Sequence, residues 1–137
     1  MIRPEFTQDW RELPVSTLAY IGDAVYELYV RLALLKTGGH SGDLHRKTIK
    51  LVKASAQAAA ANQILGQLTE AESAVFRRGR NNQPTSQSKN ADPVDYRVAT
   101  GLETLIGYLY LSQQDERLMG LLAQIVEGKP DGSTKTP

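Results

Sequence analysis

The chain has 137 residues, of which 41% are hydrophobic and 23% charged, a composition ordinary for one globular domain. It contains no cysteine, which excludes disulfide scaffolds and thiolate metal sites and is typical of a reducing compartment. The net charge of +1 hides an asymmetry. Residues 43–90 carry eight Lys and Arg against three acids, net +5, whereas the remainder carries eight against twelve, net −4. The basic region predicts either a surface for a polyanion or a solvated helical face.

No segment predicts a signal peptide or a membrane span, because the N-terminus lacks an apolar core and every apolar run is short. We therefore expect a cytoplasmic protein, or a stromal protein of plastids if the source is a plant. Residues 1–128 are expected to form one domain and residues 129–137 a flexible tail. The expected fold class is all-α, because alternating β-branched residues are absent and alanine, leucine and glutamine dominate.

Apolar periodicity and capping signals predict helices in the first half of the chain. The first is expected over residues 16–36, because Pro14 precedes it and the pair Gly38-Gly39 ends it. A second begins at Asp43, which is placed to cap it, and bends near residues 54–56 into an alanine-rich helix that ends near residue 68. On the second helix, the residues expected to point inward are Leu44, Ile49, Leu51 and Val52, and those expected on the polar face are Arg46, Lys50 and Lys53.

The second half of the chain has equally clear signals. Thr69-Glu-Ala-Glu72 is a capping box and predicts a short helix to about residue 79. Residues 81–90 are polar and predict a loop, which is either functional or disordered. Asp92-Pro93 supplies an N-cap and a proline in the first turn of a helix that runs to residue 111. A last helix is expected over residues 115–126.

One carboxylate interrupts the apolar first helix. Asp23 lies opposite one apolar stripe, on a side that it shares with Ala19, Tyr26 and Val30. A helix that is apolar all round is expected to be buried, and a buried carboxylate is costly unless it is paired or bound to a metal. Gly22, beside this acid, lets another backbone or a ligand approach closely.

A second acid repeats the arrangement on the helix that begins at Pro93. Glu103 lies opposite its apolar stripe and has Gly107 one turn later. Two acids that each break the local pattern predict one shared site. Hard cations such as Mg²⁺ are often held by one or two carboxylates together with waters and substrate phosphates. The alternative for each acid alone is a hydrogen-bonded core carboxylate or a helix-capping partner.

The residues around both acids resemble the ribonuclease III family. Ile21-Gly-Asp-Ala-Val25 is similar to the core of its signature, Glu-x-x-Glu-Phe-Leu-Gly-Asp-Ala-Val. Glu103-Thr-Leu-Ile-Gly-Tyr-Leu-Tyr-Leu111 is similar to its second acidic helix, and residues 44–52 resemble the linking helix more loosely. The resemblance spans about residues 16–122. It implies a ribonuclease III catalytic-domain-like helical fold and an endonuclease that cuts double-stranded RNA with Mg²⁺ as a homodimer.

The departures from the family pattern are informative too. The two earlier glutamates of the signature fall on Ser16 and Ala19, and the aspartate before the second-helix glutamate falls on Thr100. Asp23 and Glu103 remain as the implied catalytic, metal-holding residues, and a firmly held second metal is not expected. No double-stranded RNA-binding domain is expected after the last helix. These features resemble the Mini-ribonuclease III branch, whose members trim the ends of the large-subunit (23S) ribosomal RNA precursor.

Basic and aromatic residues predict the partners. The expected RNA-binding residues are those that flank the polar loop and two on the second helix: Arg77, Arg78, Arg80, Lys89, Arg46 and Lys50. Five tyrosines on the two acid-bearing helices predict core packing or a homodimer interface through the first helix: Tyr20, Tyr26, Tyr29, Tyr108 and Tyr110. A ribosomal protein or pre-ribosome is a further expected partner. The rival interpretation is a non-catalytic ribonuclease III-like protein that binds RNA or ribosomes as a structural component.

Overall fold

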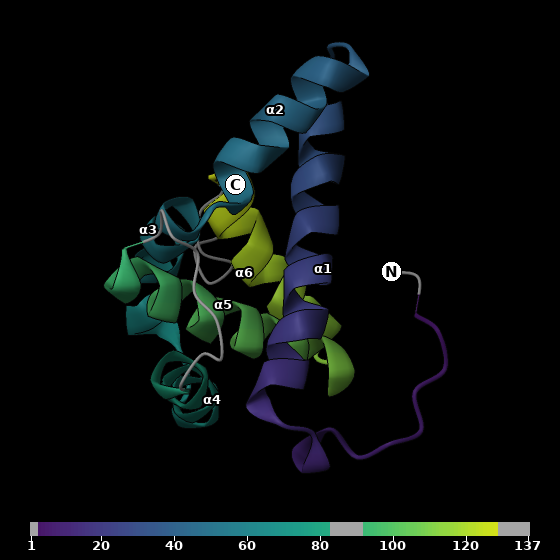
Figure 1. Cartoon of the computed structure of the whole chain (residues 1–137). Coiled ribbons are helices and arrows are strands. Elements are labelled where there is room, and N and C mark those ends of the chain that lie inside the picture. Colours follow the sequence, from purple (N-terminus) through teal and green to yellow (C-terminus); the bar gives the residue numbers. More distant parts are fainter. Residues whose placement is uncertain (1–2, 83–91, 129–137) are drawn as a thin grey trace, which may run out of the picture.

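The computed structural model describes residues 3–82 and 92–128, whose regular structure is entirely helical (Figure 1). The elements in chain order are η1 (Trp10–Glu12), α1 (Val15–Leu35), α2 (Ser41–Val52), α3 (Ala54–Ile64), η2 (Leu65–Gln67), α4 (Glu70–Asn81), α5 (Pro93–Leu111) and α6 (Asp115–Glu127). The all-α prediction is confirmed. Within the described residues, no helix is long and apolar enough to cross a membrane. Three predictions lie outside them: most of the polar loop, its Lys89 and the tail over residues 129–137.

The centre of the fold is α5, which packs against α1, α3, α4 and α6 (Figure 1). The predicted apolar stripe of this helix is buried: Leu102, Leu105 and Leu109 are each at most 1% exposed. They belong to one core cluster that also includes residues of α1, α3, α4 and α6. Because the second half of α5 is covered on several sides, Thr104 is fully buried and Glu103 is only partly exposed, whereas Arg97 in the first half is exposed.

Two glycines let α1 and α5 touch through their backbones. A Cβ atom added at Gly22 would lie 1.7 Å from the carbonyl oxygen of Glu103, and one added at Gly107 would lie 1.9 Å from the carbonyl oxygen of Leu18. No side chain fits in either place. The prediction that Gly22 admits another backbone is confirmed, and the approaching backbone is that of Glu103 itself.

Two of the predicted caps are present and one is wrong. The Thr69 hydroxyl accepts from the Glu72 N–H while the Glu72 carboxylate accepts from the Thr69 N–H, which completes the capping box. Asp92 caps α5, with Pro93 in the first turn. Asp43, however, does not cap α2, which begins at Ser41 with His40 as its N-cap. Asp43 lies inside the first turn, where its negative charge is favourable at the helix N-terminus, and pairs with Arg46.

The expectation that α1 is buried all round is wrong. Its buried residues are Leu18, Ala19, Gly22, Tyr26 and Val30. The opposite stripe leaves Leu28, Leu32 and Leu35 more than half exposed. On α2, Ile49 and Leu51 are also exposed, contrary to the prediction that they point inward. The reason is that α1 and α2 form a hairpin whose end projects beyond the other helices, so these apolar residues stay uncovered by residues 3–82 and 92–128 (Figure 1).

The tyrosines divide between the core and the surface. Tyr26 and Tyr108 are buried, and Trp10 packs edge-on against Tyr108 with a distance of 4.7 Å between ring centroids. The Tyr29 hydroxyl donates to Glu127 at 2.8 Å and so ties α1 to α6. Tyr20 is 76% exposed on α1. Core packing therefore accounts for some of these tyrosines, whereas Tyr20 belongs to an open surface.

Candidate active site

The structure brings Asp23 and Glu103 together, as the sequence predicts. Asp23 directly follows Gly22, and the contact of Gly22 with the Glu103 backbone sets the two helices at the distance at which the carboxyl groups hydrogen-bond to each other. A carboxylate only accepts hydrogen bonds, so a bond between two carboxyl groups requires a proton between them. The hydrogen bond with Asp23 therefore favours the protonated form of Glu103.

The electrostatics of the pair follow from this geometry. Burial, the hydrogen bond with Asp23 and the negative charge of Asp23 together raise the pKa of Glu103 to about 8, and a hydrogen bond from Gln57 opposes the rise. Glu103 is largely buried, but Asp23 is exposed, so the expectation of a buried carboxylate is wrong for Asp23. Asp23 lies at the edge of the buried face of α1, directly after Gly22, where its side chain reaches both Glu103 and solvent. The acid pair is consequently open to solvent on one side and accessible to a ligand.

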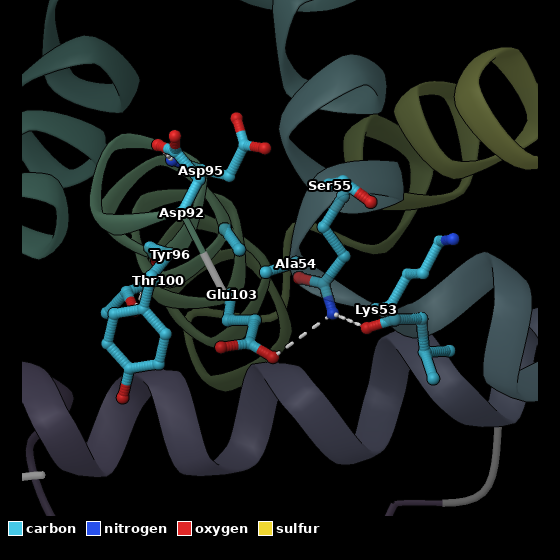
Figure 2. A pocket seen from close by; sticks show the side chains of 11 residues that line it. Lys53, Ala54, Ser55, Asp92, Asp95, Tyr96, Thr100 and Glu103 are labelled. Carbon is cyan, nitrogen blue, oxygen red and sulfur yellow. Dashed lines mark hydrogen bonds between the residues drawn. The ribbon is translucent and has the colours of Figure 1, made fainter. Parts of the chain in front are cut away.

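A pocket of about 590 Å³ adjoins Glu103, between the start of α3 and the first half of α5. Figure 2 shows Glu103 directed toward α1, with Lys53 to one side and the pair Asp92 and Asp95 to the other. The residues that line the pocket are Val52, Lys53, Ala54, Ser55, Gln57, Asp92, Asp95, Tyr96, Ala99, Thr100 and Glu103. The pocket therefore places a basic side chain, polar groups and one acid of the pair within a single concavity.

Gln57 is a site residue that the sequence analysis did not predict. It lies on α3 and is only 2% exposed. Its Nε2 donates to the Val52 carbonyl oxygen at 2.8 Å and to Glu103 Oε2 at 3.4 Å, which Figure 2 draws as dashed lines. Its Oε1 has no hydrogen-bond partner in the described part of the chain. The available signal was weak: Gln57 is a long polar side chain between the alanines of residues 54–61.

The structure separates the predicted RNA-binding residues into two groups. Arg77, Arg78 and Arg80 lie in the last turns of α4, whereas Arg46 and Lys50 lie on α2. In Figure 1 these helices lie at different ends of the molecule, so the two groups do not form one continuous patch. Lys53, which follows α2 directly, lines the pocket beside Glu103. Of the basic residues predicted for the polar face of α2, Lys53 is the one that lines the same pocket as Glu103.

The acid pair fits a hard divalent cation that keeps part of its hydration shell. Among the described residues, no group of three or more His, Cys, Asp or Glu is arranged to hold a metal ion. Two carboxylates are nevertheless a common donor set for Mg²⁺, which fills its other positions with water and phosphate oxygens. The contact between the Asp23 and Glu103 carboxyl groups supports this fit, because a cation bound between them would neutralise two like charges held close together.

Comparison with known proteins gives consistent matches along most of the chain. The ribonuclease III domain family matches residues 16–114. The Mini-ribonuclease 3 of Clostridium tetani is 46% identical over 125 residues, which cover 89% of this chain and 83% of that protein. The Mini-ribonuclease 3 of Symbiobacterium thermophilum is 50% identical over 111 residues, or 80% and 85% of the two chains. A crystal structure of a Fusobacterium nucleatum protein has a TM-score of 0.78 and 26% identity, over 89% of this chain and 98% of that one.

Proposed function

Because the chain belongs to the ribonuclease III family, as a Mini-ribonuclease 3-like enzyme that cleaves double-stranded RNA, we propose that it is a Mg²⁺-dependent endonuclease that matures the ends of the 23S ribosomal RNA precursor. The observation that carries the proposal is the contact between Asp23 and Glu103 beside an open pocket. We place the activity in the cytoplasm, where such a precursor would be met.

In this proposal Asp23 and Glu103 are the catalytic residues, and both carboxyl groups bind the cation. A Mg²⁺ ion held by these two residues would supply charge neutralisation at the phosphate and would make an attacking water more nucleophilic. Both carboxyl groups would hold the cation in their ionised forms, so a bound cation would lower the raised pKa of Glu103. The exposed side of Asp23 leaves room for a phosphate of the substrate. The Gln57 amide holds Glu103 Oε2 from the buried side.

The basic residues position the duplex. Lys53 lies in the pocket beside Glu103, and Arg46 and Lys50 continue along α2. Arg77, Arg78 and Arg80 on α4, with Lys89 in the following segment, supply a second group. Arg and Lys contacts to phosphates orient a duplex without reading its sequence. Two separate groups on one domain favour contact at two places along a duplex over contact with a single nucleotide.

The exposed apolar surface of the α1–α2 hairpin supports a homodimer. Leu28, Leu32 and Leu35 form one exposed apolar stripe on α1, and Ile49 and Leu51 are exposed apolar residues of α2. Apolar surface of this kind on a small domain is typical of an interaction site. A second copy of the chain would bury it. Sedimentation of the wild type as a monomer at micromolar concentration would contradict the dimer, and Leu32→Glu is expected to convert a dimer into monomers.

A non-catalytic role in RNA or ribosome binding is the alternative function. A purely structural acid is stabilised by a basic partner, as Glu72 is by Arg117. Asp23 and Glu103 instead destabilise each other when both are ionised. The repulsion between the two ionised acids lowers the stability of the folded protein, but the same pair of charges can bind a cation. This favours the catalytic proposal over a purely structural role.

A cleavage assay tests the proposal. The protein is incubated with long double-stranded RNA and with a 23S precursor whose ends are paired, in Mg²⁺ and in EDTA. We expect discrete cuts in the precursor stem with Mg²⁺ and intact RNA with EDTA. Asp23→Asn serves as the inactive control. Binding of the duplex without cleavage at any Mg²⁺ concentration would support the non-catalytic alternative.

A further inference from the structure

The orientation of the Gln57 amide is fixed by its surroundings. The Val52 carbonyl oxygen lies 2.8 Å from one amide atom and can only accept, so that atom must be the nitrogen. The same nitrogen lies 3.4 Å from Glu103 Oε2. A flipped amide would bring two oxygens together at 2.8 Å. Oε1 is therefore held away from both acceptors.

This leaves a buried acceptor that has no partner. Gln57 is 2% exposed, and its Oε1 makes no hydrogen bond within residues 3–82 and 92–128. A buried polar atom of this kind is costly, and in native proteins it calls for an explanation such as a catalytic role or an absent ligand. Gln57 lines the pocket that Glu103 also lines. The unpartnered atom therefore belongs to the site and not to a remote part of the core.

We propose that Gln57 is a positioning residue of the site, which holds Glu103 through Nε2 and accepts through Oε1 a hydrogen bond from an O–H group of the bound complex. The inference rests on the proposed function, that is, on cation binding by Asp23 and Glu103. Two O–H groups have the required chemistry: a hydration water of the cation and the 2′-hydroxyl of the ribose beside the cleaved bond. A phosphate oxygen does not, because it only accepts.

This role also explains how so few acids suffice. Positions that carry carboxylates in the family signature hold Ser16, Ala19 and Thr100 here. An amide oxygen adds an acceptor without adding a third negative charge to a pair that already repels. Groups that orient metal-binding carboxylates typically change metal affinity by about tenfold or more when they are removed.

Two substitutions and one matched control test the proposal. Gln57→Met keeps the length of the side chain and removes both the donor and the acceptor. Gln57→Glu keeps an oxygen acceptor and replaces the donor. Gln63→Met makes the first change on the exposed surface of the same helix, outside the pocket. Circular dichroism and thermal melting without metal report whether each variant folds, so that loss of structure is measured separately.

The first arm measures metal binding without RNA. Mn²⁺ is titrated and free Mn²⁺ is followed by electron paramagnetic resonance. If a hydration water is the donor, Gln57→Met weakens Mn²⁺ binding about tenfold, Gln57→Glu restores it at least in part, and Gln63→Met leaves it unchanged.

The second arm measures single-turnover cleavage of duplexes that carry one 2′-deoxyribose beside the cleaved bond. If the ribose hydroxyl is the donor, the wild type cuts the deoxy-substituted duplex more slowly than the all-ribose one, and Gln57→Met cuts both at one rate. A response in either arm supports the proposal and identifies the donor. Unchanged Mn²⁺ affinity together with unchanged discrimination overturns it. The proposal is also overturned if Gln57→Met lowers Mn²⁺ binding and cleavage only in proportion to the fraction of protein that has unfolded. Gln57 would then be only a core residue.

Asp23→Asn separates this inference from the proposed function. If Asp23→Asn leaves Mn²⁺ binding intact, the metal site itself is wrong and the role of Gln57 falls with it. If Asp23→Asn abolishes binding while Gln57→Met changes neither arm, the metal site stands and only the role of Gln57 is overturned.

Discussion

Two glutamates on neighbouring helices, Glu72 on α4 and Glu103 on α5, have opposite surroundings. Glu72 is 3% exposed and is held by Arg117 through two contacts of 2.9 Å and by the Thr69 N–H. Burial alone would raise its pKa, but the hydrogen bonds and the charge of Arg117 together hold the pKa of Glu72 below its ordinary value. Glu103 instead meets Asp23, and its pKa rises to about 8. The first acid has a basic partner within the chain, whereas the second faces another acid.

The largest expected effect comes from removing the charges of the acid pair. Asp23→Asn and Glu103→Gln should each lower the single-turnover rate of duplex cleavage on the order of a thousandfold, because the cation loses one of its two carboxylates. Neither variant should lose stability without metal, since each change removes like-charge repulsion. A variant that cleaves at the wild-type rate would remove that residue from the site.

Removing the basic partner of Glu72 should have the opposite effect: stability falls and the cleavage rate does not change. Arg117→Met leaves the Glu72 carboxylate buried without its basic partner, which costs about 3 kcal/mol of the free energy of unfolding. The cleavage rate per folded molecule should stay at the wild-type value, because Arg117 lies on α6 and is not among the pocket residues. Denaturant unfolding monitored by circular dichroism measures the first quantity, and active-site titration with RNA normalises the second.

The two acids should also give opposite dependences of stability on pH. Folding raises the pKa of Glu103 to about 8, so its contribution to stability is full below the ordinary pKa and is lost as pH rises toward 8. The slope is at most about 1.4 kcal/mol per pH unit. Folding lowers the pKa of Glu72, so its contribution is present above the ordinary pKa and is lost in acid.

Melting curves of the metal-free protein between pH 4 and 9 check this prediction. The Glu103→Gln variant should lose the decline toward pH 8, and saturating Mg²⁺ should suppress it in the wild type. A decline of the same size in Glu103→Gln would assign it to another group.

The smallest effect on chemistry is expected from residues that touch neither glutamate. Replacing Arg77, Arg78, Arg80 and Lys89 together with alanine should raise KM for duplex RNA much more than it lowers kcat, because phosphate contacts position the substrate. Each lost contact should reduce the slope of log affinity against log salt by about one. If the quadruple variant has the same KM and the same salt slope as the wild type, the duplex does not bind at α4. The next residues to replace are then Arg46, Lys50 and Lys53, on and after α2.

The sequence predicted the helices well because their ends carry local signals. The capping box at Thr69 and the Asp92-Pro93 start are complete within one turn and need no tertiary information. The exposed stripe of α1 was not predictable in the same way. Apolar periodicity predicts that Leu28 and Leu32 pack against other apolar residues. It does not predict whether those residues belong to this chain or to another.

The site was predicted to the extent that its residues break local rules. Asp23 and Glu103 each interrupt an apolar helix beside a glycine, and that conflict is visible in the sequence. Gln57 breaks no rule, because glutamine is a good helix former in an alanine-rich segment. Its importance arises from a contact with Glu103 that only the packing of α3 against α5 creates.

The contact between Gly22 and the Glu103 backbone has a consequence for the protein during its synthesis on the ribosome. Asp23 lies on the first long helix to leave the ribosome, and Glu103 on the last but one. A nascent or truncated chain that lacks α5 carries only half of the acid pair, however well its earlier helices form. If this pair is the nuclease site, as we propose, an unfinished chain has no complete site, because the two halves meet only when α1 and α5 dock.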